Sequence, residues 1–279
     1  MLSSVSSCGI TDSAQPVRTL FTSGNQEWRV DGKLHRLDGP AVIDVDGTQQ
    51  WFVDGKLHRL AGPAIIEKDG TLRWYVADLR HRLDGPAVVF PNGYEEWYKD
   101  GNLHRLDGPA ITSPDGTQKW YVENQRHRLD GPAIIRANGE EEWFFEGQHH
   151  RLNGPAFISG DGTYTWYVLG NRHRLDGPAH IEKNGLQFWY INDTLHRLDG
   201  PAYSDPDGNQ LWYFKGTRHR LDGPAIIEAD GTQSWYVDGH DITQFSAHQN
   251  LAYIRAYQQV INDASLSAVF QSAPTENGL

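Results

Sequence analysis

Residues 51–64 read Trp-Phe-Val-Asp-Gly-Lys-Leu-His-Arg-Leu-Ala-Gly-Pro-Ala, and the landmarks of this stretch return every 23 residues along the chain. The ten Trp residues keep this spacing without exception from Trp28 to Trp235. A His-Arg-Leu triplet occurs in nine copies, each leading through one residue into Gly-Pro-Ala. A fixed short period is the signature of a repeat architecture in which each unit packs on its neighbours. The sequence therefore predicts an array that begins near Val17 and ends near Gly239.

The composition agrees with a thin, repeated core. The chain has 279 residues, of which only 38% are hydrophobic although it carries 10 Trp, and its mean hydropathy is −0.61. A length of this kind permits one or two ordinary domains, but so polar a chain does not fill a large conventional core. The single Cys, Cys8, excludes an internal disulfide framework and any metal cage built from cysteines.

The charge balance argues against polyanionic partners. Asp and Glu number 36 against 25 Lys and Arg, which gives a formal net charge of −11. A field of this sign disfavours nucleic acid and anionic membranes as partners. No stretch approaches the roughly 18 apolar residues of a membrane span, and the first residues lack the basic and apolar segments of a signal peptide. We expect a cytoplasmic protein, located in the host cytoplasm or the virion if it is viral.

Each unit can be interpreted as two strands and two turns. In the unit that begins at Ala64, the short β-branched stretch 64–67 predicts a strand, since it follows a proline that cannot donate to a ladder. Asp69-Gly70 predicts a two-residue type I′ turn, after which residues 71–76 return antiparallel. Asp54-Gly55 and its equivalents predict a second turn, and the His-Arg-Leu-x-Gly-Pro segment a corner leading to the next strand.

A two-residue turn determines which side chains share a face. It places Ile65 opposite Trp74, with Ala64 and Tyr75 on the other face. The predicted core is therefore the Trp column together with the residue after each Ala and the Leu of His-Arg-Leu. The fold class that follows is all-β, an elongated solenoid or ribbon of 23-residue β-hairpin repeats with a short α-helical C-terminal element.

These repeats resemble a known family. Residues 51–58, Trp-Phe-Val-Asp-Gly-Lys-Leu-His, are similar to the segments of MORN repeats in their bacterial and viral variant form. The resemblance covers roughly residues 17–239 and departs from the family in the His-Arg-Leu-Asp-Gly-Pro-Ala corner, where the common repeat has a shorter His-Gly-x-Gly. It implies a scaffold or interaction module, in some members associated with lipids. Related bacterial variants have antitoxin or immunity roles, and similar arrays occur in phages and large viruses.

The nine His-Arg corners are the candidate site, and they allow two interpretations. In the structural one, Arg bonds corner carbonyls or the Asp two residues later, as Arg82 and Asp84 would, and His bridges backbone groups of adjacent units. In the binding one, the corners form a basic stripe on an acidic array. Ala61 and Asn153 replace the corner Asp in two units, so Arg59 and Arg151 are expected to be the least neutralised and to receive acidic partner groups. The candidate partner-binding residues are Arg59, Arg151, His58, His150, Arg82, Arg105 and Arg128.

Metal, cofactor and catalytic sites are not predicted. Equivalent His residues of neighbouring units lie about 10 Å apart, whereas two nitrogens on one zinc ion lie within about 4 Å. The tandem pair His149-His150 points to opposite faces of a strand, and His180 is expected to be a hydrogen-bonded core histidine. The Trp column could stack bases or sugars, but a core role is simpler. No catalytic triad, carboxylate pair or phosphate loop stands apart from the repeat, so an enzyme that uses corner His, Arg and Asp is the remotest alternative.

The two ends differ from the array. Residues 1–16 are Ser-rich and are predicted to form a flexible or docking arm. In residues 240–279, Asp241 and Gln244 look like a capping box, and an apolar face is formed by Ala247, Leu251, Ile254, Tyr257, Ile261 and Ala264. Leu266, Val269 and Phe270 are expected to form a second short helical turn. The helix is either a cap on the last hairpin or a docking element that also allows a homo-oligomer.

The sequence thus favours a non-enzymatic protein-binding or structural scaffold with a protein as partner. The alternatives are an inhibitor or antitoxin-like protein, or a protein that sequesters a small anionic ligand between units.

Overall fold

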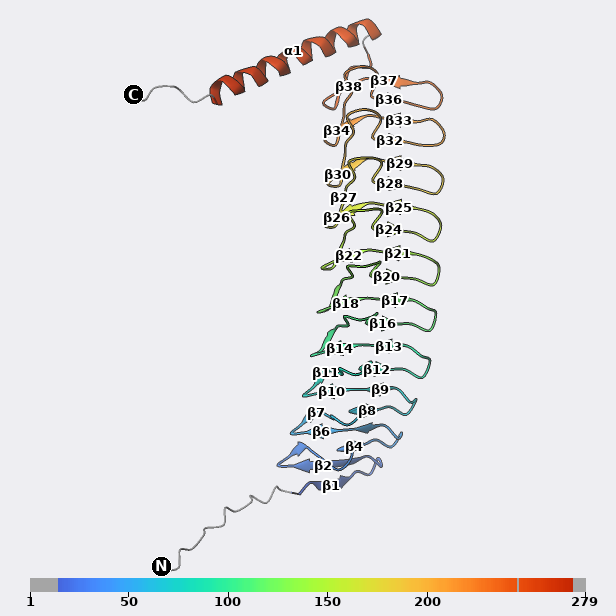
Figure 1. Ribbon diagram of the computed structural model, residues 1–279, viewed down its shortest axis with the longest axis vertical. Coiled ribbons are helices and arrows are strands. Elements are labelled where there is room, and N and C mark those ends of the chain that lie inside the picture. Colours follow the sequence, from blue (N-terminus) through green and yellow to red (C-terminus); the bar gives the residue numbers. More distant parts are fainter. Residues whose placement is uncertain (1–14, 245, 273–279) are drawn as a thin grey trace, which may run out of the picture. The chain divides into compact units, whose positions relative to one another are not determined.

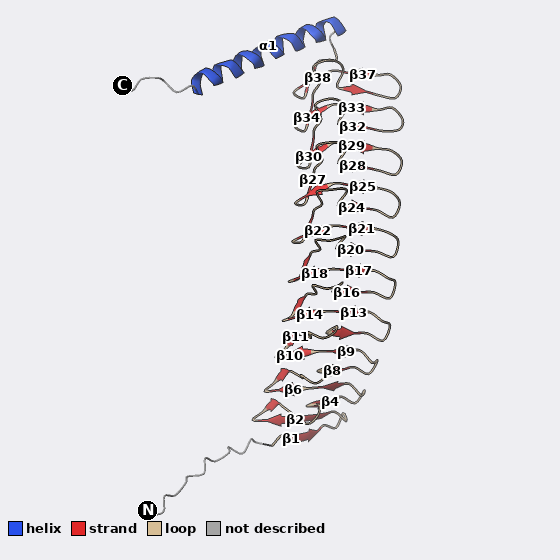
Figure 2. Ribbon diagram, viewed as in Figure 1, coloured by secondary structure: helices blue, strands red, loops and turns tan. Residues whose placement is uncertain are grey.

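The computed structural model describes residues 15–244 and 246–272 (Figure 1). These residues form two compact units, one that extends to residue 138 and includes 145–147, and one that consists of 139–144 and the residues from 148 onward. Each unit is a succession of short antiparallel hairpins, and the second also carries the helix α1 (Ala247–Ser272) (Figure 2). The predicted fold class, an all-β array of hairpin repeats with one C-terminal helix, is confirmed. The predicted arm 1–16 lies, up to residue 14, outside the described residues.

Most strands belong to ladders that run from hairpin to hairpin. In the first unit these strands are β1 (Val17–Leu20), β2 (Gln26–Val30), β4 (Val42–Ile43), β5 (Gln49–Gln50), β8 (Ile65–Ile66), β9 (Leu72–Arg73), β12 (Val88–Val89), β13 (Glu95–Glu96), β16 (Ile111–Thr112), β17 (Gln118–Lys119) and β20 (Ile134–Ile135). In the second unit they are β21 (Glu141–Glu142), β24 (Phe157–Ile158), β25 (Tyr164–Thr165), β28 (His180–Ile181), β29 (Gln187–Phe188), β32 (Tyr203–Ser204), β33 (Gln210–Leu211), β36 (Ile226–Ile227) and β37 (Gln233–Ser234).

The remaining strands form the small hairpins that precede the corners. They are β3 (Lys33–Leu34), which pairs with the end of β2, then β6 (Phe52–Val53), β7 (Lys56–Leu57), β10 (Tyr75–Val76), β11 (Leu79–Arg80), β14 (Tyr98–Lys99), β15 (Asn102–Leu103), β18 (Tyr121–Val122), β19 (Gln125–Arg126), β22 (Phe144–Phe145), β23 (Gln148–His149), β26 (Tyr167–Val168), β27 (Asn171–Arg172), β30 (Tyr190–Ile191), β31 (Thr194–Leu195), β34 (Tyr213–Phe214), β35 (Thr217–Arg218), β38 (Tyr236–Val237) and β39 (His240–Asp241).

The turn at Asp69-Gly70 has three residues, so the predicted two-residue type I′ turn is wrong at this position. Glu67 and Thr71 close the turn through the Glu67 N–H and the Thr71 carbonyl at 2.9 Å, and Gly70 alone has positive φ, at 89°. The Asp69 carboxylate accepts a hydrogen bond from the Thr71 N–H. A three-residue loop with Gly in the left-handed position is the second common hairpin type. The two-residue turn occurs in the other hairpin, where Asp54 and Gly55 have φ of 51° and 82°.

This extra turn residue reverses the predicted faces. Ile65 pairs with Arg73 rather than with Trp74, and a shift of one residue moves every side chain to the opposite face of a strand. Trp74 therefore lies on the face of the Ala residues. Its backbone N–H donates to the backbone carbonyl of Ala87 in the next repeat at 2.8 Å. The same hydrogen bond joins each of the nine Trp from Trp28 to Trp212 to the Ala of the following repeat.

The core differs from the predicted one in two columns. All nine Ala of Gly-Pro-Ala are fully buried, at 0% exposure. The Leu of His-Arg-Leu, expected in the core, is exposed in eight copies, at 73–82%. Of the Trp column, only Trp51 is buried, and the other nine Trp are half-buried. The residue after Ala does belong to the core, since Val42, Val88, Ile111, Ile134 and Ile226 are buried.

The helix begins later than predicted. Ser246 and Gln249 form the capping box, in which the Gln249 N–H donates to Ser246 Oγ and the Ser246 N–H donates to Gln249 Oε1. The predicted box at Asp241 and Gln244 is wrong, because Asp241 lies in β39 and accepts from the Thr243 N–H. One continuous helix extends to Ser272, so the expected second helical turn belongs to α1 itself.

One face of α1 packs on the last hairpin. Ile254 is 2% exposed and contacts Val237 and Ile242, with Leu221, Trp235 and Tyr257 packed around them. Of the predicted apolar face, Leu251 and Ile261 are exposed and Asn250 is buried instead. The side chains of Ala247 and Ala264 lie outside the described part of the chain. Among the described residues, no helix is long and apolar enough to cross a membrane.

Candidate functional site

Each corner is built on a cation–π stack. The guanidinium of the corner Arg lies over the ring of the Trp eight residues earlier, at 3.8–4.2 Å from the ring centroid in all nine copies. Arg82 lies 4.2 Å from Trp74 in this way. The guanidinium covers one face of each indole, and of the nine Trp from Trp28 to Trp212 Trp51 is buried and the other eight are half-buried.

The corner glycine lies on the other side of the guanidinium. A Cβ at Gly85 would lie 2.6 Å from Arg82 Cζ, and the corresponding distances at the nine corners are 2.6–3.2 Å. No side chain fits at such a separation without displacing the Arg. The close approach of the guanidinium thus favours Gly at this position.

The hydrogen bonds of the corner Arg follow the structural interpretation. In all nine copies Nη1 donates to the carbonyl of the corner Pro, at 3.0–3.3 Å. In seven copies Nε donates to the Asp two residues later, at 2.7–2.9 Å. The Arg82 guanidinium thereby holds the pKa of the Asp84 carboxyl below its usual range. Asp38, Asp107, Asp130, Asp176 and Asp199 are shifted in the same direction by their own Arg.

Arg59 and Arg151 are the two exceptions. Within the described residues neither has a carboxylate within 4 Å, since Ala61 and Asn153 replace the corner Asp. Burial lowers the pKa of Arg59, and no compensating carboxylate raises it. These two are the least neutralised corner arginines, as the substitution pattern predicts. Docking of an acidic partner group on them stays a prediction.

The corner His residues join consecutive repeats. In seven copies Nδ1 accepts a hydrogen bond from the backbone N–H of the residue 19 positions later, at 3.1–3.3 Å. The two other copies use side chains, since His104 Nδ1 lies 2.9 Å from the Glu123 carboxylate and His173 Nδ1 lies 2.8 Å from Asn192 Oδ1. The predicted bridging of backbone groups of adjacent units by His is confirmed in these seven copies, and the bridge is made by the ring nitrogen nearest the backbone.

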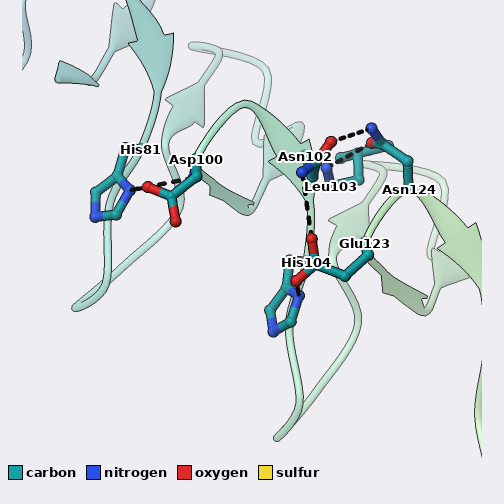
Figure 3. Close-up of polar contacts among 7 residues, drawn as sticks. All are labelled: His81, Asp100, Asn102, Leu103, His104, Glu123 and Asn124. Carbon is teal, nitrogen blue, oxygen red and sulfur yellow. Dashed lines mark hydrogen bonds and ion pairs between the residues drawn. The ribbon is translucent and has the colours of Figure 1, made fainter. Parts of the chain in front are cut away.

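In some repeats a carboxylate accompanies the His bridge. His81 Nδ1 lies 2.8 Å from Asp100, and in the next repeat Glu123 stands beside His104 (Figure 3). Glu123 also accepts from the Asn102 amide, and Asn124 accepts from the Leu103 N–H (Figure 3). These contacts fasten the tips of the small hairpins to one another and leave an acidic group next to the corner.

The corner Leu contributes almost no buried surface to the fold in eight of the nine copies. Its exposure of 73–82% in eight copies contrasts with the His, Arg, Gly and Ala around it, which all contact the array. The exposed copies are Leu37, Leu60, Leu83, Leu106, Leu129, Leu152, Leu175 and Leu198. Their apolar character predicts a place in the core, and this prediction is wrong. The signal against that assignment is their position, at the tip of a Leu-x-Gly-Pro turn.

Neighbouring corners enclose a groove. In the first unit, the groove between the Arg59 and Arg82 corners has a volume of 430 Å³ and is lined by Leu60, Trp74 and Leu83 among others. In the second unit, a groove of 790 Å³ is lined by the corresponding residues Leu198, Trp212 and Leu221. Tyr257 and Ile261 of α1 form an additional wall of this second groove.

The structure brings together only some of the predicted partner-binding residues. Arg59 and Arg82 line the same groove. Arg105 and Arg128 each occupy their own corner in the first unit, stacked on Trp97 and Trp120. His58 and His150 are used in bridges to the Ala77 and Leu169 backbone. The corner arginines and histidines are thus structural members of the site, and the exposed leucines form its surface.

A polar cluster interrupts the core of the second unit. Glu142 is 6% exposed, and His149 Nε2 lies 2.7 Å from its carboxylate. Thr165 Oγ1 lies 2.8 Å from His180 Nδ1, which confirms His180 as a hydrogen-bonded, half-buried core residue. His149 faces this cluster while His150 faces the corner, as the strand alternation predicts. Burial raises the pKa of Tyr167 beside them.

Glu142 and His149 form one pair of this cluster and Thr165 and His180 another, and together with Tyr167 and Arg172 they line a cavity of 380 Å³. Within the described residues no three His, Cys, Asp or Glu side chains converge as a metal ion would require. Neither a protein-family model nor any curated protein matches the chain.

Proposed function

We propose that the chain is a MORN-like repeat protein that acts as a non-enzymatic protein-binding scaffold, with the corner leucines as its contact surface. The observation that supports this most is the repeated exposure of one apolar residue. Leucine recurs at the tip of every corner, yet it contributes little buried surface in eight of nine copies. Folding does not require an apolar residue there, since a polar one is better solvated at such a position.

The leucines also occur in pairs across grooves, which favours a binding role over isolated surface exposure. Leu60 and Leu83 line one groove together with the indole of Trp74. Clustered exposed apolar side chains rimmed by charged groups are typical of protein-binding sites. The corner Asp84 and its partner Arg82 provide such a rim.

A protein partner fits these corners better than a small anion does. The Nη1 and Nε groups of most corner arginines already donate to Pro and Asp within the array. An anion would have to displace the corner Asp and would meet the field of a chain with net charge −11. An inhibitory or antitoxin-like role is one way in which such a scaffold would act on its partner.

Photo-crosslinking tests the proposal. A benzoylphenylalanine placed at Leu106, which is 80% exposed, should yield one discrete adduct in an extract of the organism that encodes the chain. The matched control is Val45, an exposed apolar residue in a hairpin loop away from the corners, at 70%. An adduct from position 106 and not from position 45 supports the proposal. Absence of any adduct at Leu60, Leu83 and Leu106, or equal adducts at Val45, would overturn it.

A further inference from the structure

The cavity of 380 Å³ in the second unit is bounded by ladder strands and by small hairpins. Four of its residues form one row across the consecutive ladder strands β21, β24, β25 and β28 (Figure 1), and they are Glu142, Phe157, Thr165 and His180. Directly paired residues of antiparallel strands point to the same face, so these four side chains share one side of the cavity. The small hairpins supply His149, Tyr167 and Arg172.

Both histidines of the cavity are departures of the chain from its own repeat. At the position of His180 the other repeats have an aliphatic or aromatic residue, for example Ile134 and Ile226. At the position of His149 they have Leu or Arg. The array therefore packs without an imidazole at either position, and two separate changes in the sequence bring imidazole rings to the same cavity.

Each imidazole is held by a deeply buried polar group. Glu142 is 6% exposed, and its carboxylate lies 2.7 Å from His149 Nε2. Thr165 is 3% exposed, and its Oγ1 lies 2.8 Å from His180 Nδ1. Burial of polar groups at these positions costs free energy that an apolar pair would not cost. The pairs fix the orientation of two polar rings at the cavity, which is what a preorganised binding site requires.

The Tyr167 hydroxyl also lacks the partner that its position has elsewhere in the array. In an earlier repeat Arg80 Nε donates to the hydroxyl of Tyr75, in the same small hairpin, at 3.3 Å. Arg172, at the position of Arg80, instead donates through Nε to the Asp193 carboxylate at 2.6 Å. Within the described part of the chain no group hydrogen-bonds the Tyr167 hydroxyl. Burial raises the pKa of this hydroxyl, so it stays protonated and can donate to a ligand.

The groups that line the cavity match an uncharged, hydroxyl-rich ligand. The Glu142 carboxylate accepts hydrogen bonds, the Arg172 guanidinium donates them, and the Tyr167 hydroxyl does both. Neighbouring hydroxyls on one ring offer the same mixture of donors and acceptors. Arg172 is already paired with Asp193, and the net charge of −11 disfavours an anionic ligand. The ring of Phe157 adds an apolar wall for the C–H face of such a ligand.

We propose that this cavity binds a single sugar ring, whose hydroxyls are hydrogen-bonded by Glu142, Tyr167, Arg172 and His180. The volume of 380 Å³ lies near the lower end of the range of roughly 300–1,000 Å³ for small-molecule sites, so it takes one ring, free or at the end of a glycan. The corner leucines do not line this cavity. The inference therefore goes beyond the proposed scaffold function, and its failure would leave that function standing.

Saturation-transfer difference NMR on the full-length chain tests the inference. The probes are free glucose, galactose, mannose and N-acetylglucosamine. At least one should bind saturably with a Kd on the order of 1 mM, the affinity expected of a ligand with about a dozen non-hydrogen atoms. If no free sugar binds, a printed glycan array presents the same rings as terminal units, and binding there supports a glycan end as the source.

Two variants locate the bound sugar. Thr165→Leu with His180→Ile copies the paired Leu211 and Ile226 of a later repeat, so the array accommodates it, and it should abolish detectable binding. Tyr167→Phe removes one hydroxyl and should weaken binding about fivefold to tenfold, the usual loss for one hydrogen bond. The matched control Tyr213→Phe, at the same position two repeats later and outside the cavity, should leave binding within about twofold.

Two results would overturn the inference. One is the absence of binding both to the free sugars and to the glycan array. The other is equal binding by the natural chain and by either cavity variant, which would place the sugar elsewhere. The urea midpoint of each variant, measured alongside, shows whether a loss of binding comes from the cavity or from unfolding of the array. A loss of binding found only in variants that have unfolded counts against the site.

Discussion

The guanidinium of Arg82 lies 4.2 Å from the ring centre of Trp74 and directly against Gly85, where a Cβ would come within 2.6 Å of its central carbon. The ring, the guanidinium and the glycine lie against one another as three layers. This explains why Trp, Arg and Gly recur at fixed offsets in the repeat. A change in one layer alters the other two.

The first prediction concerns the glycine layer. Gly85→Ala should displace the Arg82 guanidinium from the Trp74 ring, because the new methyl group occupies its place. The Arg82 Nε–H resonance, shifted by the ring current of the indole, should move toward the position of an exposed arginine in a nitrogen-15 NMR spectrum. The loss of the stack should cost about 1 kcal/mol of unfolding free energy.

Gly93→Ala is the matched control, since Gly93 has a φ of 87° and nothing lies within 4 Å of its added Cβ. It should destabilise the chain by about 1 kcal/mol through backbone strain and leave the Arg82 resonance in place. A displaced Arg82 resonance in the Gly93 variant, or an unmoved one in the Gly85 variant, would contradict the layered arrangement.

The second prediction concerns the cation. Arg82→Lys keeps the charge but loses the planar group that lies on the indole and donates to both Pro86 and Asp84. Urea denaturation should show a loss of about 1 kcal/mol. Asp84→Asn removes only an exposed carboxylate and should leave the unfolding free energy nearly unchanged. Equal losses in the two variants would mean that the ion pair, not the stack, holds the corner.

The repeat length and the hairpin pattern could be predicted from sequence, because the 23-residue spacing is the same whatever the geometry of the individual turns. The 23-residue spacing of Trp28 to Trp235 and the Asp-Gly turns specify hairpins whatever their exact geometry. The roles of Arg82 and His81 could also be predicted in kind, because buried charged and polar groups must find partners. The stack on Trp74 could not, since it depends on which face the indole occupies.

The face of the sheet on which Trp74 lies depends on whether the preceding turn has two or three residues. Asp69-Gly70 is compatible with a two-residue and with a three-residue loop, and the choice decides whether Ile65 or Ala64 shares a face with Trp74. The small Ala, which composition would rank below Leu as a core residue, is the one that the ladder buries completely.

The third prediction follows from this exchange of roles. Leu83→Ser, at 73% exposure, should leave the unfolding free energy within about 0.5 kcal/mol of the natural chain. Ala87→Val, at 0% exposure and beside the Trp74 backbone, should cost about 1–3 kcal/mol through overpacking. Chemical denaturation of the two variants checks both values. A larger loss for Leu83→Ser than for Ala87→Val would reverse the assignment of the core.

The fourth prediction concerns pH and the attachment of α1. The hydrogen bond to Asp238, together with burial, raises the pKa of Tyr257 to about 12. A phenol has an ordinary pKa of about 10, so the folded chain favours the protonated hydroxyl. The contact therefore stabilises the helix fully below pH 10, and its contribution is lost as the pH rises from 10 through 12. Carbon-13 NMR of the tyrosine Cζ atoms should show this late ionisation directly.

Removing the Asp238 carboxylate separates the effect of the hydrogen bond on the Tyr257 pKa from the effect of burial. In Asp238→Asn the carboxylate charge is gone, so the Tyr257 titration should move back toward 10 while Tyr94, raised to about 12 by its own burial and Glu96, should stay unchanged. Tyr257→Phe should remove one late-titrating signal and abolish the alkaline release of α1, which a solvent-exposed label at Val260 would report. If Tyr257 titrates near 10 in the natural chain, the hydroxyl does not donate to Asp238, and the contact that holds α1 to the last hairpin is not the one described.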